Sequence, residues 1–229
     1  MDEIARIKNT YQARIEKRVI DRYSLFYPGE LYMLQRREEE TLRLLRRQGL
    51  SAICDRRILE IGCGRGARLL DWVRWGARPD ALFGVDLMAA FVSEATNTLP
   101  RGHFAVASGN RLPFRDGEFD IVVQSTVFSS ILDPALRRAM ADEMIRVTSR
   151  QGAMLWYDFR YPSLGNADVR PVAAAEIAAL FPNRRIAARS LTLLPPLARR
   201  LAPVSVIACR ALEKLFPPLR SHLLAVIRE

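Results

Sequence analysis

ILEIGCGRGARL, residues 58–69, joins a short apolar run to a glycine-rich turn and to the first residues of a predicted helix. Glycine stands at every second position of the turn, at Gly62, Gly64 and Gly66. Because glycine has no Cβ, the backbone of such a turn can approach a ligand closely and can adopt conformations that other residues rarely reach. The stretch therefore predicts a strand, a ligand-binding turn and a helix in succession.

Short β-branched runs alternate with helical segments in the chain after this turn. The predicted strands are RILEI, LFGVD, FAVAS, FDIVVQ and AMLWYD, with helices to about Trp75, from about Ala89 and over about 134–148. Strands that alternate with helices at this pitch predict a parallel sheet covered on both faces. A helix at 173–181, a strand near 186–194, an amphipathic stretch at 197–216 and the final run HLLAVI complete the pattern.

The first part of the chain differs from this α/β pattern. Residues 2–48 look helical, with a break at Tyr27-Pro28-Gly29. Two domains are therefore predicted: an N-terminal helical cap over residues 1–50 and the α/β domain over residues 51–229.

Composition limits the class of protein. The 229 residues are 49% hydrophobic, which fits a globular α/β chain, and no apolar run approaches the length of about 20 residues that spans a bilayer. The start of the chain has no apolar leader segment, so we expect a cytoplasmic protein. The three cysteines lack paired spacing and there are only two histidines, so no metal site is expected.

The charge of the chain is strongly positive, with a formal net charge of +10 that rests mainly on arginine. Such an excess attracts anionic acceptors, lipid headgroups or nucleic acid, although an arginine-rich genome would explain it equally well.

An acidic residue ends the second predicted strand. Asp86 follows Gly62 by 24 residues, and a carboxylate at this place can accept hydrogen bonds from both hydroxyls of a ribose. Gly62, Gly64 and Ala67 also satisfy a relaxed dinucleotide fingerprint, so the turn alone leaves a nicotinamide-dependent oxidoreductase open.

Three further stretches extend the pattern: Glu60 in the glycine turn, GNRLPFRDGEFDIVVQS at 109–125 and RVTSRQGAMLWYD at 146–158. Together with Asp86 they resemble the class I S-adenosylmethionine-dependent methyltransferases, specifically the small-molecule, type 11-like branch. The resemblance implies a Rossmann-like, doubly wound sheet of seven mostly parallel strands with an antiparallel last strand. It also implies S-adenosylmethionine as the cofactor.

The resemblance assigns roles to residues at the matching positions. Glu60, Gly62 and Gly64 would hold the methionine moiety, Asp86 the ribose and Leu87 the face of the adenine. Asn110 would meet the adenine edge, where the family usually has aspartate, and Gln124 would form the wall near the sulfonium. Cys63, Arg111 and Tyr23 are the remaining predicted cofactor contacts. Tyr23 belongs to a tyrosine-rich segment with Tyr27, Tyr32 and Gln35 that looks like a cap over the cofactor, or else a dimer contact.

Candidate catalytic residues lie at the carboxyl end of the fifth strand and in the last strand. Asp158 and His222 are the predicted general bases, and Arg160 is the predicted anchor for an anionic or hydroxylated acceptor. Asp158 could instead serve only to cap its strand.

The acceptor class follows in part from missing motifs. Gln124-Ser-Thr-Val stands where methyltransferases of nucleic-acid amino groups have Asn or Asp followed by Pro-Pro, and no Pro-Cys pair is present, so nucleic acid is not expected.

The C-terminal third resembles bacterial methyltransferases of polysaccharide and glycolipid pathways. We expect methyl transfer to a small-molecule, glycan or lipid-linked acceptor, with oxygen as the accepting atom, by a monomer or homodimer. The stretch 197–216 either contacts a membrane peripherally or forms an extra helix between the last strands. A third hypothesis is a non-catalytic subunit that keeps the cofactor fold.

Overall fold

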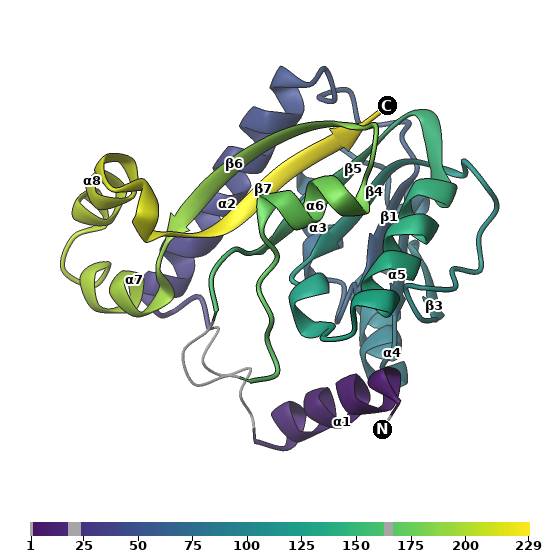
Figure 1. The fold of residues 1–229 in the computed structure, drawn as a ribbon, viewed down its shortest axis with the longest axis horizontal. Coiled ribbons are helices and arrows are strands. Elements are labelled where there is room, and N and C mark those ends of the chain that lie inside the picture. The colour runs from purple at the N-terminus through teal and green to yellow at the C-terminus, as the bar shows by residue number, and fades with distance from the viewer. Residues whose placement is uncertain (1, 18–23, 163–166) are drawn as a thin grey trace.

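The computed structural model describes residues 2–17, 24–162 and 167–229, which form one seven-stranded sheet with helices on both faces (Figure 1). The strands are β1 (Ile58–Ile61), β2 (Leu82–Asp86), β3 (His103–Val106), β4 (Phe119–Ser125), β5 (Thr148–Phe159), β6 (Arg185–Leu193) and β7 (Arg220–Arg228). They stand in the order β3-β2-β1-β4-β5-β7-β6. The first five are parallel to one another, whereas β7 is antiparallel to both β5 and β6. The predicted fold class is confirmed.

The helices divide between the two faces of the sheet. They are α1 (Glu3–Glu16), α2 (Pro28–Arg47), α3 (Ala67–Arg74), α4 (Ala89–Thr98), α5 (Pro134–Val147), α6 (Ala174–Leu180), α7 (Pro195–Leu201) and α8 (Val206–Leu215). One core contains Ile7 of α1, Met140 of α5 and Ile177 of α6. The opposite core contains Leu44 of α2 and Trp72 of α3. Short 3₁₀ turns lie at Pro79–Ala81, Phe128–Ser130 and Pro217–Leu219.

Local sequence explains where several helices begin. The Asp133 carboxylate caps α5 by accepting the Ala135 N–H at 2.8 Å, and Pro134 supplies the first helical residue. Ser205 caps α8 in the same way, since its hydroxyl oxygen accepts the Ala208 N–H at 3.1 Å. Pro28 begins α2, at the break that the sequence predicted.

The N-terminal helices lie on different sides of the sheet. α1 belongs to the same face as α5, and α2 to the same face as α3. Helix α2 shares a core with the sheet. The division of the chain into a cap over 1–50 and a domain over 51–229 stays a prediction. In the connection between β6 and β7, the stretch 197–216 contains α7 and α8. Within the described ranges, no helix combines the length and apolar character needed to cross a bilayer.

Candidate functional site

A cavity of about 270 Å³ lies at the carboxyl ends of β1, β2 and β4. The chain runs from β1 to β2 and β3 on one side and places β4 and β5 on the other, so the cavity occupies the point where the strand order reverses. In open parallel sheets, ligands bind at this topological switch point. Among the predicted cofactor residues, those on its wall are Gly62, Cys63, Gly64, Asp86, Leu87 and Asn110.

The glycine turn forms the floor of the cavity. Gly62 has a φ of +69°, and a Cβ at this position would stand 2.4 Å from Cγ2 of Val127. Any larger residue would therefore be strained and would clash with the loop after β4. This packing brings the ends of β1 and β4 close together beneath the cavity.

Asp86 connects the turn to the end of β2. Its Oδ2 accepts the Gly64 N–H at 2.9 Å and its Oδ1 accepts the Met88 N–H at 2.9 Å. Burial raises the pKa of the carboxyl, although both N–H groups oppose this shift. Each oxygen keeps a free lone pair, so the carboxylate can accept hydrogen bonds from two adjacent hydroxyls.

The wall beyond Asp86 is the predicted adenine side. Leu87 and Asn110 both lie on it, together with Ser108. The Ser108 hydroxyl donates to Oδ1 of Asn110, so one lone pair of the amide oxygen is already used. The neighbouring Arg111 is not on the wall. Cys63 does lie on the wall. Burial raises the pKa of its thiol, so this side chain is neutral.

Glu60 and Arg68 form an ion pair beside the cavity, in which Glu60 is buried and Arg68 is partly exposed. Arg68 lies on the wall, and its Nε stands 3.6 Å from Oε1 of Glu60. The Glu60 side chain is only 1% exposed, and its Oε2 has no hydrogen-bond partner among the described residues. Burial raises the pKa of Glu60 to about 7, against the opposing charges of Arg68 and Arg37. A cation brought to this place would relieve the isolated oxygen.

A second hollow of about 30 Å³ adjoins the first, and Arg68 and Ser125 line both. Gln124 lies on the wall of this smaller hollow and not on that of the larger cavity. Its Oε1 accepts the Val127 N–H at 3.2 Å, while its Nε2 and the Ser125 hydroxyl are buried without partners in the described part of the chain. These donors, with the Arg68 guanidinium, suit a carboxylate.

Helix α1 closes the cavity on the remaining side. Ile4, Ile7 and Tyr11 lie on the wall, and the Tyr11 hydroxyl is 3.2 Å from Oγ of Ser130, another wall residue. Sequence reasoning missed these residues because it placed the cap in the later, tyrosine-rich segment. The signal was the spacing of Ile4, Ile7 and Tyr11, which puts them on one face of a helix.

The residues predicted for that cap lie elsewhere. Tyr23 falls outside the described residues. Tyr27 is 57% exposed, and Tyr32 is buried with its hydroxyl donating to Glu213 of α8. Both are absent from the wall of the cavity, and so is Gln35.

The predicted catalytic residues are not on the cavity wall and do not form one group. Asp158 is buried, its Oδ2 accepts the Ser129 N–H at 3.1 Å, and burial raises its pKa to about 6. His222 stacks on Tyr157 on the other face of the sheet, with ring centroids 4.7 Å apart, and burial lowers its pKa to about 3. The Arg160 guanidinium lies over the ring of Tyr161.

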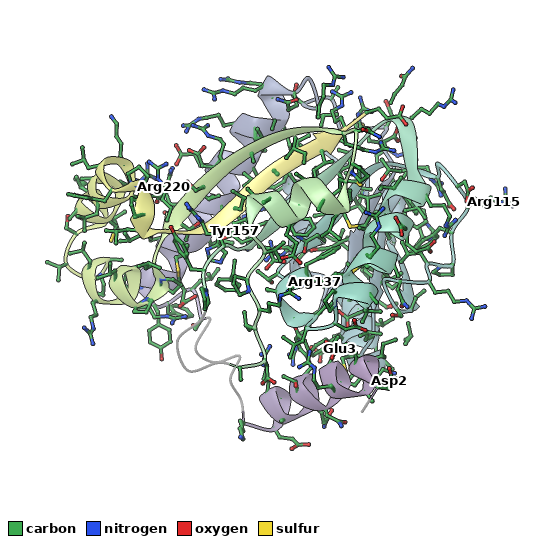
Figure 2. The ribbon with its side chains drawn as sticks, in the orientation of Figure 1. Asp2, Glu3, Arg115, Arg137, Tyr157 and Arg220 are labelled. Carbon is green, nitrogen blue, oxygen red and sulfur yellow. The ribbon has the colours of Figure 1, made fainter. Side chains whose placement is uncertain are left out.

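The chemistry of the wall fits an adenosine that carries an amino acid. Asp86 offers two acceptors for hydroxyls, and the Glu60–Arg68 pair meets a zwitterion with opposite charges. Within the described ranges, no three side chains of His, Cys, Asp or Glu group together so that they could hold a metal ion. Figure 2 shows Glu3 at the start of α1, on the side of that helix that faces the sheet.

Comparison with known proteins agrees with this geometry. Residues 58–152 match the family described as a methyltransferase domain. Demethylmenaquinone methyltransferase of Beutenbergia cavernae is 32% identical over 123 residues, which are 52% of this chain and 49% of the relative. Malonyl-acyl-carrier-protein O-methyltransferase of Geobacter sulfurreducens is 37% identical over 116 residues, which are 46% of this chain and 41% of the relative. The chain thus spans less than half the length of these curated relatives.

The fold is also similar to that of solved structures. A crystal structure from Archaeoglobus fulgidus, described as a SAM-dependent methyltransferase, superposes with a TM-score of 0.60 at 16% identity. The match covers 84% of this chain and 94% of that structure. At this identity the likeness shows the fold alone.

Proposed function

We propose that the chain is a class I S-adenosylmethionine-dependent methyltransferase, a proposal that the match of residues 58–152 to the methyltransferase-domain family supports. It would transfer a methyl group from this cofactor to a small, largely apolar acceptor in the cytoplasm. The observation that carries the proposal is the placement of Asp86 and the Glu60–Arg68 pair around one cavity. A pyrophosphate would find the Glu60 carboxylate beside it, which disfavours a nicotinamide dinucleotide.

The protein's contribution to this reaction is mainly positioning. The cofactor supplies an activated methyl group, so holding donor and acceptor in line accounts for about 7–11 kcal/mol of barrier in well-oriented cases. Asp86 would fix the ribose, Leu87 and Asn110 the adenine, and Arg68 with Glu60 the amino acid. Helix α1 would cover the acceptor and exclude water.

The acceptor proposed here is apolar where it meets α1. The wall on that side consists of Ile4, Ile7, Phe91, Ile131, Leu136 and Met140, with the hydroxyls of Tyr11 and Ser130 between them. Such a wall suits a ring or an acyl chain better than a free sugar, so a glycan acceptor would be lipid-linked. Neither curated relative is named for a nucleic acid, and one is named as an O-methyltransferase.

For transfer to oxygen, we propose that Asp158 acts as the base once the bound acceptor reaches it, in preference to His222, which lies on the other face of the sheet. Asp158 is buried beside the cavity and is not on its wall in this structure. A base is most effective when its pKa lies near the working pH, and Asp158 at about 6 is closer than His222 at about 3. Asp158 also accepts a hydrogen bond from Ser129, the neighbour of the wall residue Ser130. Arg160 remains a predicted acceptor anchor.

Ligand binding tests the proposal. S-adenosylhomocysteine at 100 times its dissociation constant should stabilise the protein by about 2.7 kcal/mol in thermal denaturation, whereas NAD should not. Asp86→Ala should abolish this shift, and Asp142→Ala, which removes an exposed carboxylate of α5, should preserve it. Labelled-methyl transfer to phenols, acyl thioesters, glycolipids and free sugars then distinguishes the acceptors. A shift with NAD alone would overturn the proposal.

A further inference from the structure

Helices α7 and α8 and the start of α2 meet at one end of the molecule, on the left in Figure 1. The α2 and α7 backbones touch there, because a Cβ on Gly29 would stand 2.7 Å from Cα of Arg199. Beneath this contact, Tyr32 of α2 packs in one small core with Ala198 of α7 and Cys209 of α8. We call residues 24–31 and 195–220 together the α7–α8 end.

Exposed apolar side chains concentrate at the α7–α8 end. Among the described residues, the large apolar side chains exposed here are Leu25, Phe26, Tyr27, Leu31, Leu197, Val204, Val206, Ile207, Leu215 and Phe216. The rest of the described chain exposes Leu42, Leu70 and Val106. Phe26 is 98% exposed, Val204 82% and Ile207 81%. Exposed apolar side chains that cluster in this way mark an interaction surface.

Helix α8 carries a second apolar ridge in addition to its packed face. The packed face holds Cys209 and Glu213. On the exposed side, Ile207, Ala211 and Leu215 recur at intervals of four residues. Two cations, Arg210 and Lys214, also stand four residues apart on that side and flank the ridge.

The charge at this end is positive on balance. The cations of the α7–α8 end are Arg199, Arg200, Arg210, Lys214 and Arg220, against the acids Glu30 and Glu213. Glu30 pairs with Arg199 at 2.7 Å, and the buried Glu213 accepts hydrogen bonds from Arg36 and Tyr32. Arg210 is half exposed and stands 3.6 Å from Glu39, a weaker contact, so a positive surface remains around α8. An apolar ridge flanked by cations is typical of helices that lie in the interface of anionic bilayers.

We propose that the α7–α8 end binds the surface of an anionic lipid bilayer. Val204, at the turn between α7 and α8, and Ile207 and Leu215 on α8 enter the headgroup region. Lys214 pairs with a lipid phosphate, and Arg210 exchanges its exposed contact with Glu39 for another phosphate. The charge decides between a membrane and a protein partner, because protein interfaces are depleted of lysine and of charge at their centres. This surface lies apart from the cofactor cavity, so the proposal does not depend on methyl transfer.

Vesicle flotation tests the proposal. The full chain should float with vesicles that contain phosphatidylglycerol, should bind vesicles of phosphatidylcholine alone weakly, and should be released by high salt. Removing two charges with Arg210→Gln and Lys214→Gln should weaken binding by up to about 30-fold. Ile207→Ser with Val204→Ser should weaken it about tenfold or more.

Matched controls separate this surface from general charge or hydrophobicity. Arg115→Gln with Arg150→Gln removes two exposed cations elsewhere, and Leu42→Ser removes an exposed apolar side chain from the far part of α2. Both controls should bind as the unchanged protein does. Equal losses in controls and test variants, or no flotation at low salt, would overturn the proposal. So would concentration-dependent dimerisation in solution that Ile207→Ser abolishes, since the surface would then bind a second copy of the chain.

Discussion

Individual residues of the cavity meet two different parts of the proposed cofactor. Asp86 faces a nucleoside, whereas Glu60 and Arg68 face an amino acid. The two functions can be separated with 5′-methylthioadenosine, which has the same nucleoside as S-adenosylhomocysteine but lacks the amino acid. A substitution at a residue that contacts the amino acid should therefore change the affinity for S-adenosylhomocysteine and leave the affinity for 5′-methylthioadenosine unchanged.

Glu60 should make the affinity for S-adenosylhomocysteine depend on pH. Burial raises its pKa to about 7, so the carboxyl is neutral below that pH, and the ligand's ammonium group favours the ionised form. Affinity should rise as pH increases from about 6 to 8, by roughly tenfold at most per unit of pH. Calorimetric titration of both ligands measures this. Affinity for 5′-methylthioadenosine should stay constant with pH, and Glu60→Gln should remove the pH dependence. If the pH dependence of affinity persisted in this variant, Glu60 would not be the titrating group.

Among the elements, helix α1 is held over the cavity by polar contacts as well as by its apolar face. The Glu3 carboxylate accepts the Leu132 N–H at 2.6 Å, and the Arg6 guanidinium donates to the Ser130 carbonyl at 2.6 Å. The Arg6 hydrogen bond is the main cause that lowers the pKa of Glu3 to about 2. Both contacts join α1 to the loop after β4.

Glu3→Ala should therefore loosen α1 without unfolding the protein. We expect faster amide hydrogen exchange in residues 3–16, while exchange in the strands stays unchanged. Because the folded pKa is depressed, the stabilisation by Glu3 is present above its ordinary pKa of 4.5 and is lost as pH falls toward 2. Glu16→Ala, at the exposed end of the same helix, is the matched control. Equal exchange in both variants would show that apolar packing alone holds α1.

The strands and the binding turn were predictable because their signals are local. Alternation of apolar runs with helices predicts a parallel sheet, and the glycine positions predict a turn. Gly62, Gly64 and Asp86, which were singled out from the sequence, accordingly lie on the cavity wall, while their role in cofactor binding stays a prediction. The positions of α1 and α2 on the sheet could not be predicted in this way. They depend on which face of the sheet the apolar side of each helix packs against, and this involves strands that are distant in the sequence. Asp158 and His222 were predicted together from their strand positions. In the observed register, however, Asp158 pairs with Leu223 and His222 pairs with Phe159, so the two side chains lie on opposite faces of the sheet.

On the scale of the whole molecule, a largely buried polar cluster joins α2, in the first part of the chain, to α8, in its last part. Tyr32 and Arg36 of α2 both donate to Glu213 of α8, with Arg36 Nη2 at 3.0 Å from Oε1. The side chain of Glu213 is 5% exposed and that of Arg36 14%. Burial alone would raise the pKa of Glu213, but the hydrogen bonds from Arg36 and Tyr32 outweigh it and lower the pKa.

Glu213→Ala should destabilise the protein measurably. It leaves the buried Tyr32 hydroxyl without its acceptor, while Arg36 keeps Glu39 and Glu40 as partners, so the loss should be about 1–3 kcal/mol. Urea denaturation should show this loss in the free energy of unfolding, together with a lower midpoint. Glu39→Ala removes a half-exposed partner of the same arginine and should cost about 1 kcal/mol or less. Equal losses in the two variants would mean that solvent reaches the cluster and that α8 is held to α2 by apolar packing alone.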